Sequence, residues 1–377
     1  MSATMNRANK VPIAIVGGGS IARAHAGFIS KSPTCYLQAV VDPFESGKEL
    51  AAAQSVPHYE SLEQMLADAC RPDIYLVSVP NGIHVEVATE ILTGSALPKV
   101  ILIEKPLCTD SSSGSALLHL AREKGCAVVV GHHRRFQPPI QAAKAAIASG
   151  ALGRLTAVSG LWMCKKHEGY YTEAPWRASR AAGGGPVWTN LVHDVDLLAY
   201  LVGAKVVRLW AQPTLRRREH PAVTDPVEEG ASVMLHFANG VVGTLILCDN
   251  TPSPYSFESA TGENPLLARA ELPVDCYRFF GSEGSLSVPD LLLWSYKQEV
   301  ADLKGLPIGW NIPISHETLQ CTKSQPPLSE QIEHLGRVAR GEEDPVCSGQ
   351  DGLEAVKVCE AIIKAIEKGD GLPVDIE

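Results

Sequence analysis

The 377-residue sequence has no long apolar run and no excess of basic side chains, and each absence excludes a class of protein. No apolar stretch approaches the roughly 18 residues that a membrane-spanning helix needs. The first ten residues also lack the apolar segment of a secretory signal. With 42 acidic against 33 basic side chains and a net charge of −9, the chain offers no broad basic field for a nucleic acid or an anionic membrane. We therefore expect a cytoplasmic protein that binds neither.

The ten cysteines are too sparse and too scattered for a disulfide scaffold. They form no C-x-x-C pair and show no metal-finger spacing, so the sequence predicts no metal site. Cys126 and Cys248 stand in apolar runs, where a thiol behaves as a small buried hydrophobic group. We therefore expect reduced, structural cysteines. The densest basic cluster, residues 216–218, is followed at once by Glu219, and we interpret it as a solvated loop.

The composition that remains is globular, with 45% hydrophobic and 20% charged residues, and the length suggests two domains. Over the first 136 residues, short apolar runs alternate with helical patterns. Uninterrupted runs of this length suit parallel strands that are buried on both faces. The expected strands are residues 12–16, 36–41, 73–79, 99–103 and 126–130. This succession predicts an α/β domain with a doubly wound parallel sheet.

Residues 137–377 follow a different pattern, with longer alternating strands at about 155–166 and 206–214. Residues 231–248 predict a hairpin, because Asn239-Gly240 stands between two apolar-rich runs. Long strands with few intervening helices predict an α+β domain with a large open, mostly antiparallel sheet. Two helices are expected at the end of the chain. We place the boundary between the two domains after residue 136.

A glycine-rich loop, Gly-Gly-Gly-Ser-Ile-Ala at residues 17–22, lies between the first strand and the first helix and fits G-x-G-x-x-A. A pyrophosphate would lie on the free N–H groups of the helix N-terminus. Asp42 ends the next strand, where a carboxylate accepts hydrogen bonds from both ribose hydroxyls and repels a 2′-phosphate. The pattern predicts an NAD site and favours NAD over NADP. The loop residues expected to bind the cofactor are Gly17, Gly19, Ser20, Ile21 and Ala22.

Two further strand ends carry polar clusters, the loop at residues 79–84 and the step Glu104-Lys105-Pro106. In a doubly wound sheet the carboxyl ends of the strands open onto one crevice, so both loops should line the cofactor site. Proline keeps the residue before it out of the helical region, which predicts an extended Lys105. Taken alone, Glu104-Lys105 is more typical of an exposed ion pair at a turn.

In this order and spacing, the motifs resemble the glucose-fructose oxidoreductase/inositol dehydrogenase/rhizopine-catabolism (Gfo/Idh/MocA) family. The resemblance continues through residues 131–136, 175–177, 183–185 and 193–196 and covers nearly the whole chain. It implies a Rossmann domain at residues 1–136 that binds NAD, and a second domain at 137–377 that binds the substrate and forms oligomers. In family members the open sheet commonly packs against its copy in another subunit, which implies a homodimer or homotetramer.

The resemblance also implies roles for single residues. Lys105 would hydrogen-bond the reacting oxygen of a small-molecule substrate, and His193 would exchange the hydroxyl proton as hydride moves to or from the nicotinamide. The cofactor contacts implied outside the glycine-rich loop are Pro80, Asn81, His84, Glu104, Lys105, Arg134, Trp176 and Arg177. These roles imply a dehydrogenase that acts on a secondary alcohol of a sugar, a cyclitol or a similar molecule.

One position departs from the family pattern. Sugar and inositol dehydrogenases of the family usually carry Asp four residues before the catalytic histidine, and this chain has Thr189. A threonine supplies no charge, and it lacks the two carboxylate oxygens with which an aspartate can bind a polyol hydroxyl. This weakens the case for an inositol-like substrate. Asn190 or Asp194 could take over that role. Tyr170 and Tyr171 are candidates for shaping the pocket. Their place in the sequence is equally typical of surface aromatics of a lid.

Two other functions on the same fold stay open. One is NAD-dependent glycoside hydrolysis, in which the hydride is returned and no net redox change occurs. The other is a non-enzymatic regulator that senses the cofactor, which loss of the lysine or the histidine would favour. Both Lys105 and His193 are present, so the sequence favours the dehydrogenase.

Overall fold

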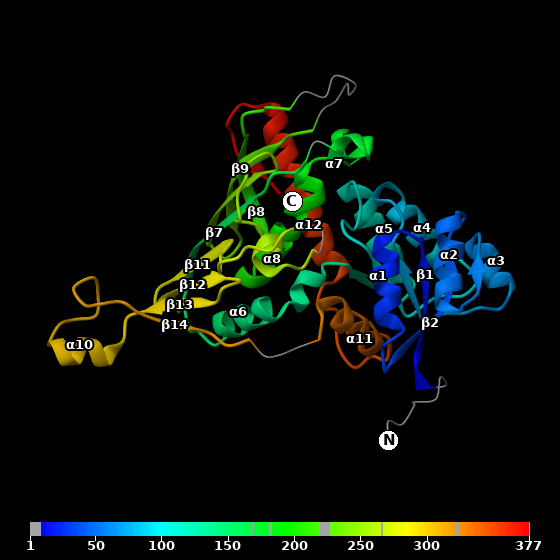
Figure 1. Ribbon diagram of the computed structural model, residues 1–377, viewed down its shortest axis with the longest axis horizontal. Helices are drawn as coiled ribbons and strands as arrows, with labels where there is room; N and C mark the ends of the chain where they lie inside the picture. Colours follow the sequence, from blue (N-terminus) through cyan, green and yellow to red (C-terminus); the bar gives the residue numbers. More distant parts are fainter. Residues whose placement is uncertain are drawn as a thin grey trace. The chain divides into compact units, whose positions relative to one another are not determined.

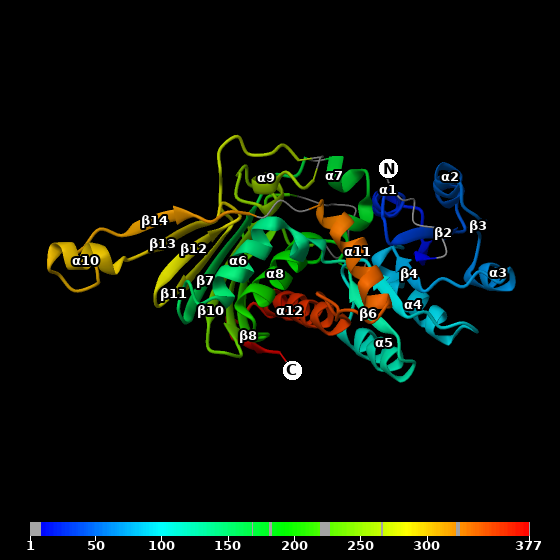
Figure 2. The same ribbon diagram turned by 90° about the horizontal axis from the view of Figure 1, so that it is seen from below.

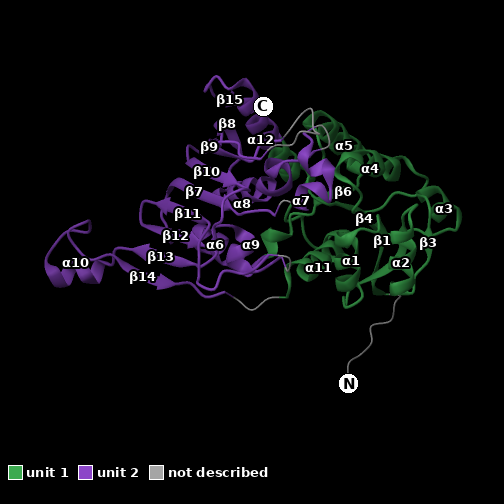
Figure 3. Ribbon diagram, turned by 45° about the horizontal axis from the view of Figure 1, so that its top comes forward, with its two compact units in different colours: residues 1–136, 324–356 green, residues 137–323, 357–377 purple. Residues whose placement is uncertain are grey.

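The structure is a computed structural model that describes residues 9–167, 169–180, 183–218, 227–264, 267–321 and 325–376 (Figure 1). The chain divides into two compact units (Figure 3). Unit 1 comprises residues 1–136 and 324–356, and unit 2 comprises residues 137–323 and 357–377. Among the described residues, no helix combines the length and the apolarity that crossing a membrane requires.

Unit 1 is built on a six-stranded parallel sheet with the order β3-β2-β1-β4-β5-β6, which confirms the predicted doubly wound fold. Helices cover both faces of this sheet (Figure 2), and every residue of β4 and β5 is buried. The strands are β1 (Val11–Val16), β2 (Cys35–Val41), β3 (His58–Tyr59), β4 (Ile74–Val77), β5 (Val100–Ile103) and β6 (Ala127–Val130). The helices are α1 (Ser20–Ile29), α2 (Glu45–Gln54), α3 (Leu62–Ala67), α4 (His84–Thr93), α5 (Ser111–Glu123) and α11 (Pro327–Ala339), with short turns η2 (Asn81–Ile83) and η3 (His133–Phe136).

Helix α11 explains why residues 324–356, which we assigned to the second domain, group with unit 1. Its residues Ile332 and Leu335 are fully buried in the same apolar core as Ile13 of β1. The carboxylate of Glu333 also accepts hydrogen bonds from the hydroxyls of Ser32 and Thr34, each at 2.5 Å. A helix far along the chain therefore completes the core of the first sheet.

Unit 2 is built on a nine-stranded sheet with the order β14-β13-β12-β11-β7-β10-β9-β8-β15. Strands β7 and β10 pair in parallel and every other neighbouring pair is antiparallel, which confirms the predicted mostly antiparallel sheet. The strands are β7 (Leu155–Met163), β8 (Val206–Pro213), β9 (Gly230–Phe237), β10 (Val242–Cys248), β11 (Tyr277–Gly281), β12 (Gly284–Val288), β13 (Leu292–Ser295), β14 (Ser315–Thr318) and β15 (Val374–Asp375). Strands β9 and β10 form the predicted hairpin around Asn239-Gly240.

Helices α6 and α8 of unit 2 lie along one face of this sheet (Figure 1). Side chains of β9 and β10 alternate between buried and exposed, as a sheet covered on one face requires. The helices are α6 (Pro138–Ala148), α7 (Gly169–Thr172), α8 (Val192–Val202), α9 (Phe257–Thr261) and α10 (Gln298–Lys304), with the short turn η4 (Pro175–Ala178) and the π-helix η5 (Val187–Leu191). Helix α12 (Gly349–Lys368) is divided between the two units after Val356.

Candidate active site

The three glycines of the glycine-rich loop in unit 1 differ in their steric surroundings. Gly17 has a φ of +103°, and a Cβ there would lie 2.7 Å from the carbonyl oxygen of Ser78. A Cβ on Gly18 would lie 2.6 Å from the backbone nitrogen of Gly47. A Cβ on Gly19 would meet no protein atom within 4 Å. Gly17 and Gly18 are therefore required by the fold, whereas Gly19 borders open space. The sequence pattern gave no role to Gly18.

This loop lines a cavity of about 590 Å³ at the carboxyl ends of β1, β2 and β4. Such a volume lies within the usual range for small-molecule sites. The lining includes most of the loop and strand-end residues predicted to bind the cofactor in this part of the chain: Gly17, Gly19, Ser20, Ile21, Asp42 and Pro80. Ala22 lies beneath the loop and is fully buried, as its predicted role in packing α1 against the sheet requires.

Asp42 supplies the acidic group at the end of β2. Its carboxylate accepts hydrogen bonds from the backbone N–H of Phe44 at 2.7 Å and from the hydroxyl of Ser46 at 3.3 Å, so its direction is fixed. Among the described residues that line the cavity, none is Lys, Arg or His. A cavity with a fixed carboxylate and no basic side chain suits the two ribose hydroxyls of NAD and disfavours a 2′-phosphate.

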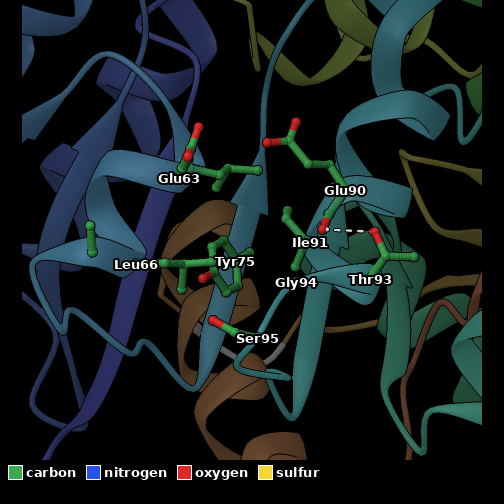
Figure 4. A pocket seen from close by; sticks show the side chains of 10 residues that line it. Glu63, Leu66, Tyr75, Glu90, Ile91, Thr93, Gly94 and Ser95 are labelled. Atoms are coloured by element: carbon green, nitrogen blue, oxygen red, sulfur yellow. Dashed lines mark hydrogen bonds between the residues drawn. The ribbon is translucent and has the colours of Figure 1, made fainter.

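A second cavity of about 490 Å³ opens in unit 1 between α3 and α4 (Figure 4). Glu63 and Glu90 stand on opposite sides of it, and Tyr75 of β4 lies between the two helices. Its lining also includes the C-terminal end of α4 at Thr93 and Gly94, where the helix dipole is negative. Glu90 lines both cavities, but only the glycine-rich cavity also borders the N-terminus of α1, where the helix dipole favours an anion. We therefore propose that the cofactor binds in the glycine-rich cavity.

The Glu104-Lys105 step follows β5, and a buried histidine fixes its carboxylate. His25 of α1 is fully buried, and its Nε2 lies 2.6 Å from Oε1 of Glu104. The other carboxylate oxygen accepts a hydrogen bond from the backbone N–H of Lys105 at 3.2 Å. Burial alone raises the pKa of Glu104, but the hydrogen bond from His25 and the charges of His25, His133 and Lys105 lower it to about 2. Glu104 is therefore a fixed anion beside Lys105.

His84 holds the two strand-end loops together. It is buried, and its Nδ1 lies 2.8 Å from the carbonyl oxygen of Pro106 while its Nε2 lies 3.0 Å from that of Val79. Burial lowers the pKa of His84, although the two carbonyl contacts oppose this. Since both ring nitrogens face the backbone, His84 positions the loop that carries Lys105. A direct contact of its ring with the cofactor stays a prediction.

Three other predicted cofactor residues of unit 1 lie near these loops. Pro80 is exposed and precedes the turn η2, and Asn81 is the first residue of that turn. Arg134 lies in η3, after β6, and is 2% exposed. Their contacts with a cofactor stay predictions.

His193 and Thr189 belong to one continuous helical segment of unit 2. Thr189 and Asn190 lie in the π-helix η5, and His193 is the second residue of α8, which follows directly. Single π-turns inside helices occur often at functional sites. The hydroxyl of Thr189 lies 2.8 Å from the carbonyl oxygen of Gly185 and 2.8 Å from Oδ1 of Asn190. The departure at position 189 is therefore an uncharged residue engaged with its own helix.

Asp194, one of the two residues expected to replace the missing carboxylate, lies in the interior of unit 2. It is fully buried, and its carboxylate accepts a hydrogen bond from the hydroxyl of Tyr277 in β11. Asn190 is partly exposed and contacts Lys166, whose Nζ donates to its Oδ1 at 2.8 Å. Of the two substitutes that the sequence left open, Asn190 is the one with a polar group near the surface.

The two tyrosines before the predicted nicotinamide contacts have different environments. Tyr171 is 4% exposed and donates a hydrogen bond to Asp249, so it is not a surface aromatic. Burial raises the pKa of Tyr171 to about 12, which keeps the hydroxyl protonated at neutral pH. Tyr170 is partly exposed, and the guanidinium of Arg177 lies 4.1 Å from its ring centroid.

Trp176 and Arg177 lie in the short turn η4 of unit 2. Trp176 is 44% exposed, whereas Arg177 is partly buried and donates to the carbonyl oxygen of Tyr170 at 2.9 Å. Arg177 therefore connects η4 to α7. The contact of either residue with a nicotinamide stays a prediction.

The interpretation of residues 216–218 as a solvated loop is wrong for Arg218. Its side chain is 15% exposed, and its guanidinium forms an ion pair with the fully buried Asp249. The physical reason is that Asp249, which directly follows β10, is buried inside the unit and needs a cation to offset the cost of burying its charge. Glu219 lies outside the described residues.

Sequence reasoning also missed Lys166, Asp249 and His25. Asp249 follows an apolar strand directly, which is the same signal that identified Asp42. His25 lies between Ala22 and Ala26 on the buried side of α1, a place where a polar side chain needs a partner. Lys166 has no such signal, because its partners are far away in the sequence. Among the described residues, no cluster of three or more His, Cys, Asp or Glu side chains could hold a metal ion.

Comparisons with known proteins identify the family of this chain. A model described as an oxidoreductase family with an NAD-binding Rossmann fold matches residues 11–132, and the Gfo/Idh/MocA C-terminal domain matches residues 140–287. Levoglucosan dehydrogenase of Pseudarthrobacter phenanthrenivorans is 26% identical over 62% of this chain and 66% of its own length. Inositol 2-dehydrogenase of Corynebacterium glutamicum is 25% identical over 72% of this chain and 77% of its own length.

Solved structures share the fold. The WlbA dehydrogenase of Bordetella pertussis, in complex with NADH and UDP-GlcNAcA, superposes with a TM-score of 0.73 at 21% identity, covering 98% of this chain and 99% of that one. Fold, glycine-rich loop and family models all agree with the resemblance that the motifs indicate. The chain belongs to the Gfo/Idh/MocA family of NAD-binding dehydrogenases.

Proposed function

We propose that the protein interconverts a secondary alcohol and a ketone on a sugar, a cyclitol or a similar small molecule, with NAD as the redox partner. One observation carries the proposal. The cavity of the glycine-rich loop and the Glu104-Lys105 step lie at the same edge of one parallel sheet, because the cavity lies at the ends of β1, β2 and β4, and the step follows β5, the neighbour of β4. This is the edge at which doubly wound sheets bind their ligands.

NAD would lie against Gly19 and the N-terminus of α1, with its ribose at Asp42, and would supply the acceptor or donor of the hydride. Lys105 donates a hydrogen bond to the reacting oxygen and stabilises the negative charge that develops on it. Glu104, held ionised by His25, keeps a negative charge next to this lysine. His193 accepts the hydroxyl proton during oxidation and returns it during reduction, a task for which imidazole is suited near neutral pH.

The relatives support a cyclic, hydroxyl-rich substrate, since those named above are dehydrogenases of levoglucosan and of inositol. Thr189 argues against close identity with the inositol enzymes, because the acidic group expected before the histidine is absent. The substrate class we propose is therefore sugar-like, without commitment to one of these two compounds.

We further propose a homodimer or homotetramer through the uncovered face of the unit 2 sheet. Met234, Val242, Ile246 and Phe280 are between 39% and 51% exposed on β9, β10 and β11. Large apolar side chains gathered on one sheet face are typical of a protein interface. Sedimentation equilibrium of the purified protein tests this, with a monomer at micromolar concentration as the opposing result.

The function is tested by mixing purified protein with NAD and a panel of polyols, cyclitols and glycosides while reading nicotinamide absorbance. Steady formation of NADH with at least one hydroxyl compound, and its reversal with the corresponding ketone, is the expected result. Cleavage of a glycoside with no net NADH would identify the hydrolase instead. Tight NADH binding with no turnover of any compound would favour the regulator.

A further inference from the structure

The second cavity of unit 1, between α3 and α4, takes no part in the proposed chemistry. Its volume of about 490 Å³ lies within the usual range for small-molecule sites. Apolar side chains of both helices form its walls, namely Leu62, Leu66 and Ala67 of α3 and Ile91 of α4. The carboxylate groups of Glu63 and Glu90 extend to the same end of the cavity (Figure 4). The cavity therefore combines apolar walls with one negatively charged end.

The two carboxylates of this cavity lack a counter-charge. Among the described residues that line it, none is Lys, Arg or His, and no described residue forms an ion pair with Glu63 or Glu90. The C-terminal end of α4, at Thr93 and Gly94, adds the negative end of a helix dipole. These groups together favour a positively charged ligand.

An organic cation suits the cavity better than a metal ion does. Two carboxylates are few for a metal site, and the described part of the chain contains no cluster of three or more His, Cys, Asp or Glu side chains that could hold a metal ion. Apolar walls also offer nothing to a hydrated ion, whereas they can bury the hydrocarbon part of an organic molecule.

Tyr75 of β4 is a second, independent sign of a ligand. It is 2% exposed, and its side chain lines the cavity between the two helices (Figure 4). No residue that the structure describes forms a hydrogen bond with its hydroxyl. Burial raises the pKa of Tyr75 to about 12, so the hydroxyl stays protonated at neutral pH and can both donate and accept. A buried hydroxyl without a partner costs free energy, which a polar group of a ligand would recover.

We propose that this cavity is a binding site for a small amphipathic amine. Its ammonium group lies at Glu63 and Glu90, its apolar body packs against the walls of α3 and α4, and a hydroxyl group pairs with Tyr75. An anion of the same size is repelled by the two carboxylates. A purely apolar molecule leaves the carboxylates and the tyrosine without partners.

The position of the cavity connects this site to the cofactor. Leu62 and Glu90 line both this cavity and the glycine-rich one. An ammonium group at Glu90 offsets a negative charge beside the place where we propose that the anionic cofactor binds. The amine should therefore tighten NADH binding, and NADH should tighten amine binding by the same factor. This coupling rests on the proposed function, whereas the binding of the amine does not.

Calorimetric titration of the cofactor-free protein with tyramine tests the site. We expect a Kd of about 1 mM or lower. Tyrosol, which carries a hydroxyl in place of the ammonium group, should bind at least about tenfold more weakly. Glu63→Gln should weaken tyramine binding about threefold to fivefold. Glu86→Gln removes an exposed acid of α4 that lies outside the cavity, and it should leave the affinity unchanged.

Tyr75→Phe separates a ligand contact from a structural role. The variant should bind tyramine about fivefold more weakly and should bind 2-phenylethylamine, which has no phenol hydroxyl, as the original protein does. Its melting temperature should not fall, because the hydroxyl has no hydrogen-bond partner among the described residues. Equal losses of affinity for both amines, or a lower melting temperature, would refute the contact with Tyr75.

NADH titration with and without saturating tyramine tests the coupling, and we expect NADH affinity to rise about twofold to fivefold. Absence of tyramine binding, equal binding of tyramine and tyrosol, or an unchanged affinity in Glu63→Gln refutes the amine site and leaves the dehydrogenase function standing. Tyramine binding without a change in NADH affinity supports the site and refutes the coupling. If NADH does not bind at all, the proposed function is refuted, and the tyramine titrations of the cofactor-free protein still decide the amine site.

Discussion

The Nε2 atom of His25 lies 2.6 Å from Oε1 of Glu104, a residue 79 positions further along the chain, and both side chains are buried. Gly131 closes this site from the neighbouring strand end, since a Cβ there would lie 2.8 Å from the Glu104 carboxylate. The contact joins the first helix of unit 1 to the loop that carries Lys105. It explains how a carboxylate stays ionised in a buried place next to the proposed catalytic lysine.

Glu104→Gln should lower stability in a pH-dependent way. The folded-state pKa of about 2 lies below the value of an unfolded glutamate, so ionised Glu104 stabilises the fold above about pH 4.5. This contribution, on the order of 3 kcal/mol, is lost as pH falls towards 2. Urea unfolding of the original protein and of Glu104→Gln, at pH 7 and at pH 3, gives the difference between their free energies of unfolding. This difference should be smaller at pH 3. Glu49→Gln, at an exposed ion pair with Arg23, is the control, and a difference for Glu104→Gln that is equal at both pH values would contradict the role of the ion pair.

Alanine at Gly18 should affect the stability of the fold, whereas alanine at Gly19 should affect NADH binding. A Cβ at Gly18 overlaps the backbone of Gly47, so Gly18→Ala should destabilise the protein by about 3 kcal/mol or more. A Cβ at Gly19 meets no protein atom, so Gly19→Ala should leave the melting temperature within about 3 °C while weakening NADH binding at least about tenfold.

Calorimetry and NADH fluorescence titration measure the two glycine effects separately. Gly27→Ala in α1, the helix that follows the loop, is the control. Its Cβ also meets open space, and it lies outside the loop. Normal NADH affinity in Gly19→Ala would show that the cofactor does not lie against this glycine.

Asp42→Ser should narrow the preference for NAD over NADP. The carboxylate is fixed by Phe44 and Ser46 at the edge of the cavity, and its removal takes away the charge that repels a 2′-phosphate. We expect the ratio of kcat/KM for NAD to that for NADP to fall about tenfold or more, corresponding to roughly 1.4 kcal/mol. Glu45→Ser removes an exposed acid outside the cavity and should leave the ratio as it is. Unchanged discrimination in Asp42→Ser would remove the basis for the NAD assignment.

Asp249→Asn should be among the most destabilising single changes in unit 2. It leaves the buried cations of Lys166 and Arg218 without their shared carboxylate, which costs about 3–5 kcal/mol for a buried pair. Asp375→Asn breaks an exposed ion pair with Arg208 and should cost less than about 1 kcal/mol. Chemical denaturation measures the free energy of unfolding of the two variants. Similar losses of this free energy in both would show that the cluster of Asp249, Lys166 and Arg218 contributes little to stability.

The strands of unit 1 could be predicted to within a few residues, because strands buried on both faces leave uninterrupted apolar runs. The run at residues 36–41, for instance, corresponds to β2 at Cys35–Val41. Strand β3 was missed, since it has only two residues, His58 and Tyr59, and neither is fully buried. The return of α11 to unit 1 was also missed, because its amphipathic pattern does not say which core it joins.

The same distinction between local pattern and tertiary packing holds for the candidate site. The glycine-rich loop and Asp42 could be predicted because their spacing along one βαβ segment is set by local geometry. His25 with Glu104, and Lys166 with Asp249, are brought together only by folding, so no spacing in the sequence indicates them. Buried charged pairs of this kind follow from packing, which a single sequence does not display.

The most direct test of the proposed chemistry is Lys105→Met, measured for both NADH binding and turnover. Methionine keeps the length of the side chain and removes its charge and its donors. We expect NADH to bind within about threefold of the original affinity while kcat falls at least about 10³-fold. Lys99→Met, at an exposed ion pair with Asp73 on the same sheet, should change neither. Near-normal turnover in Lys105→Met would contradict the assignment of this lysine to the reacting oxygen.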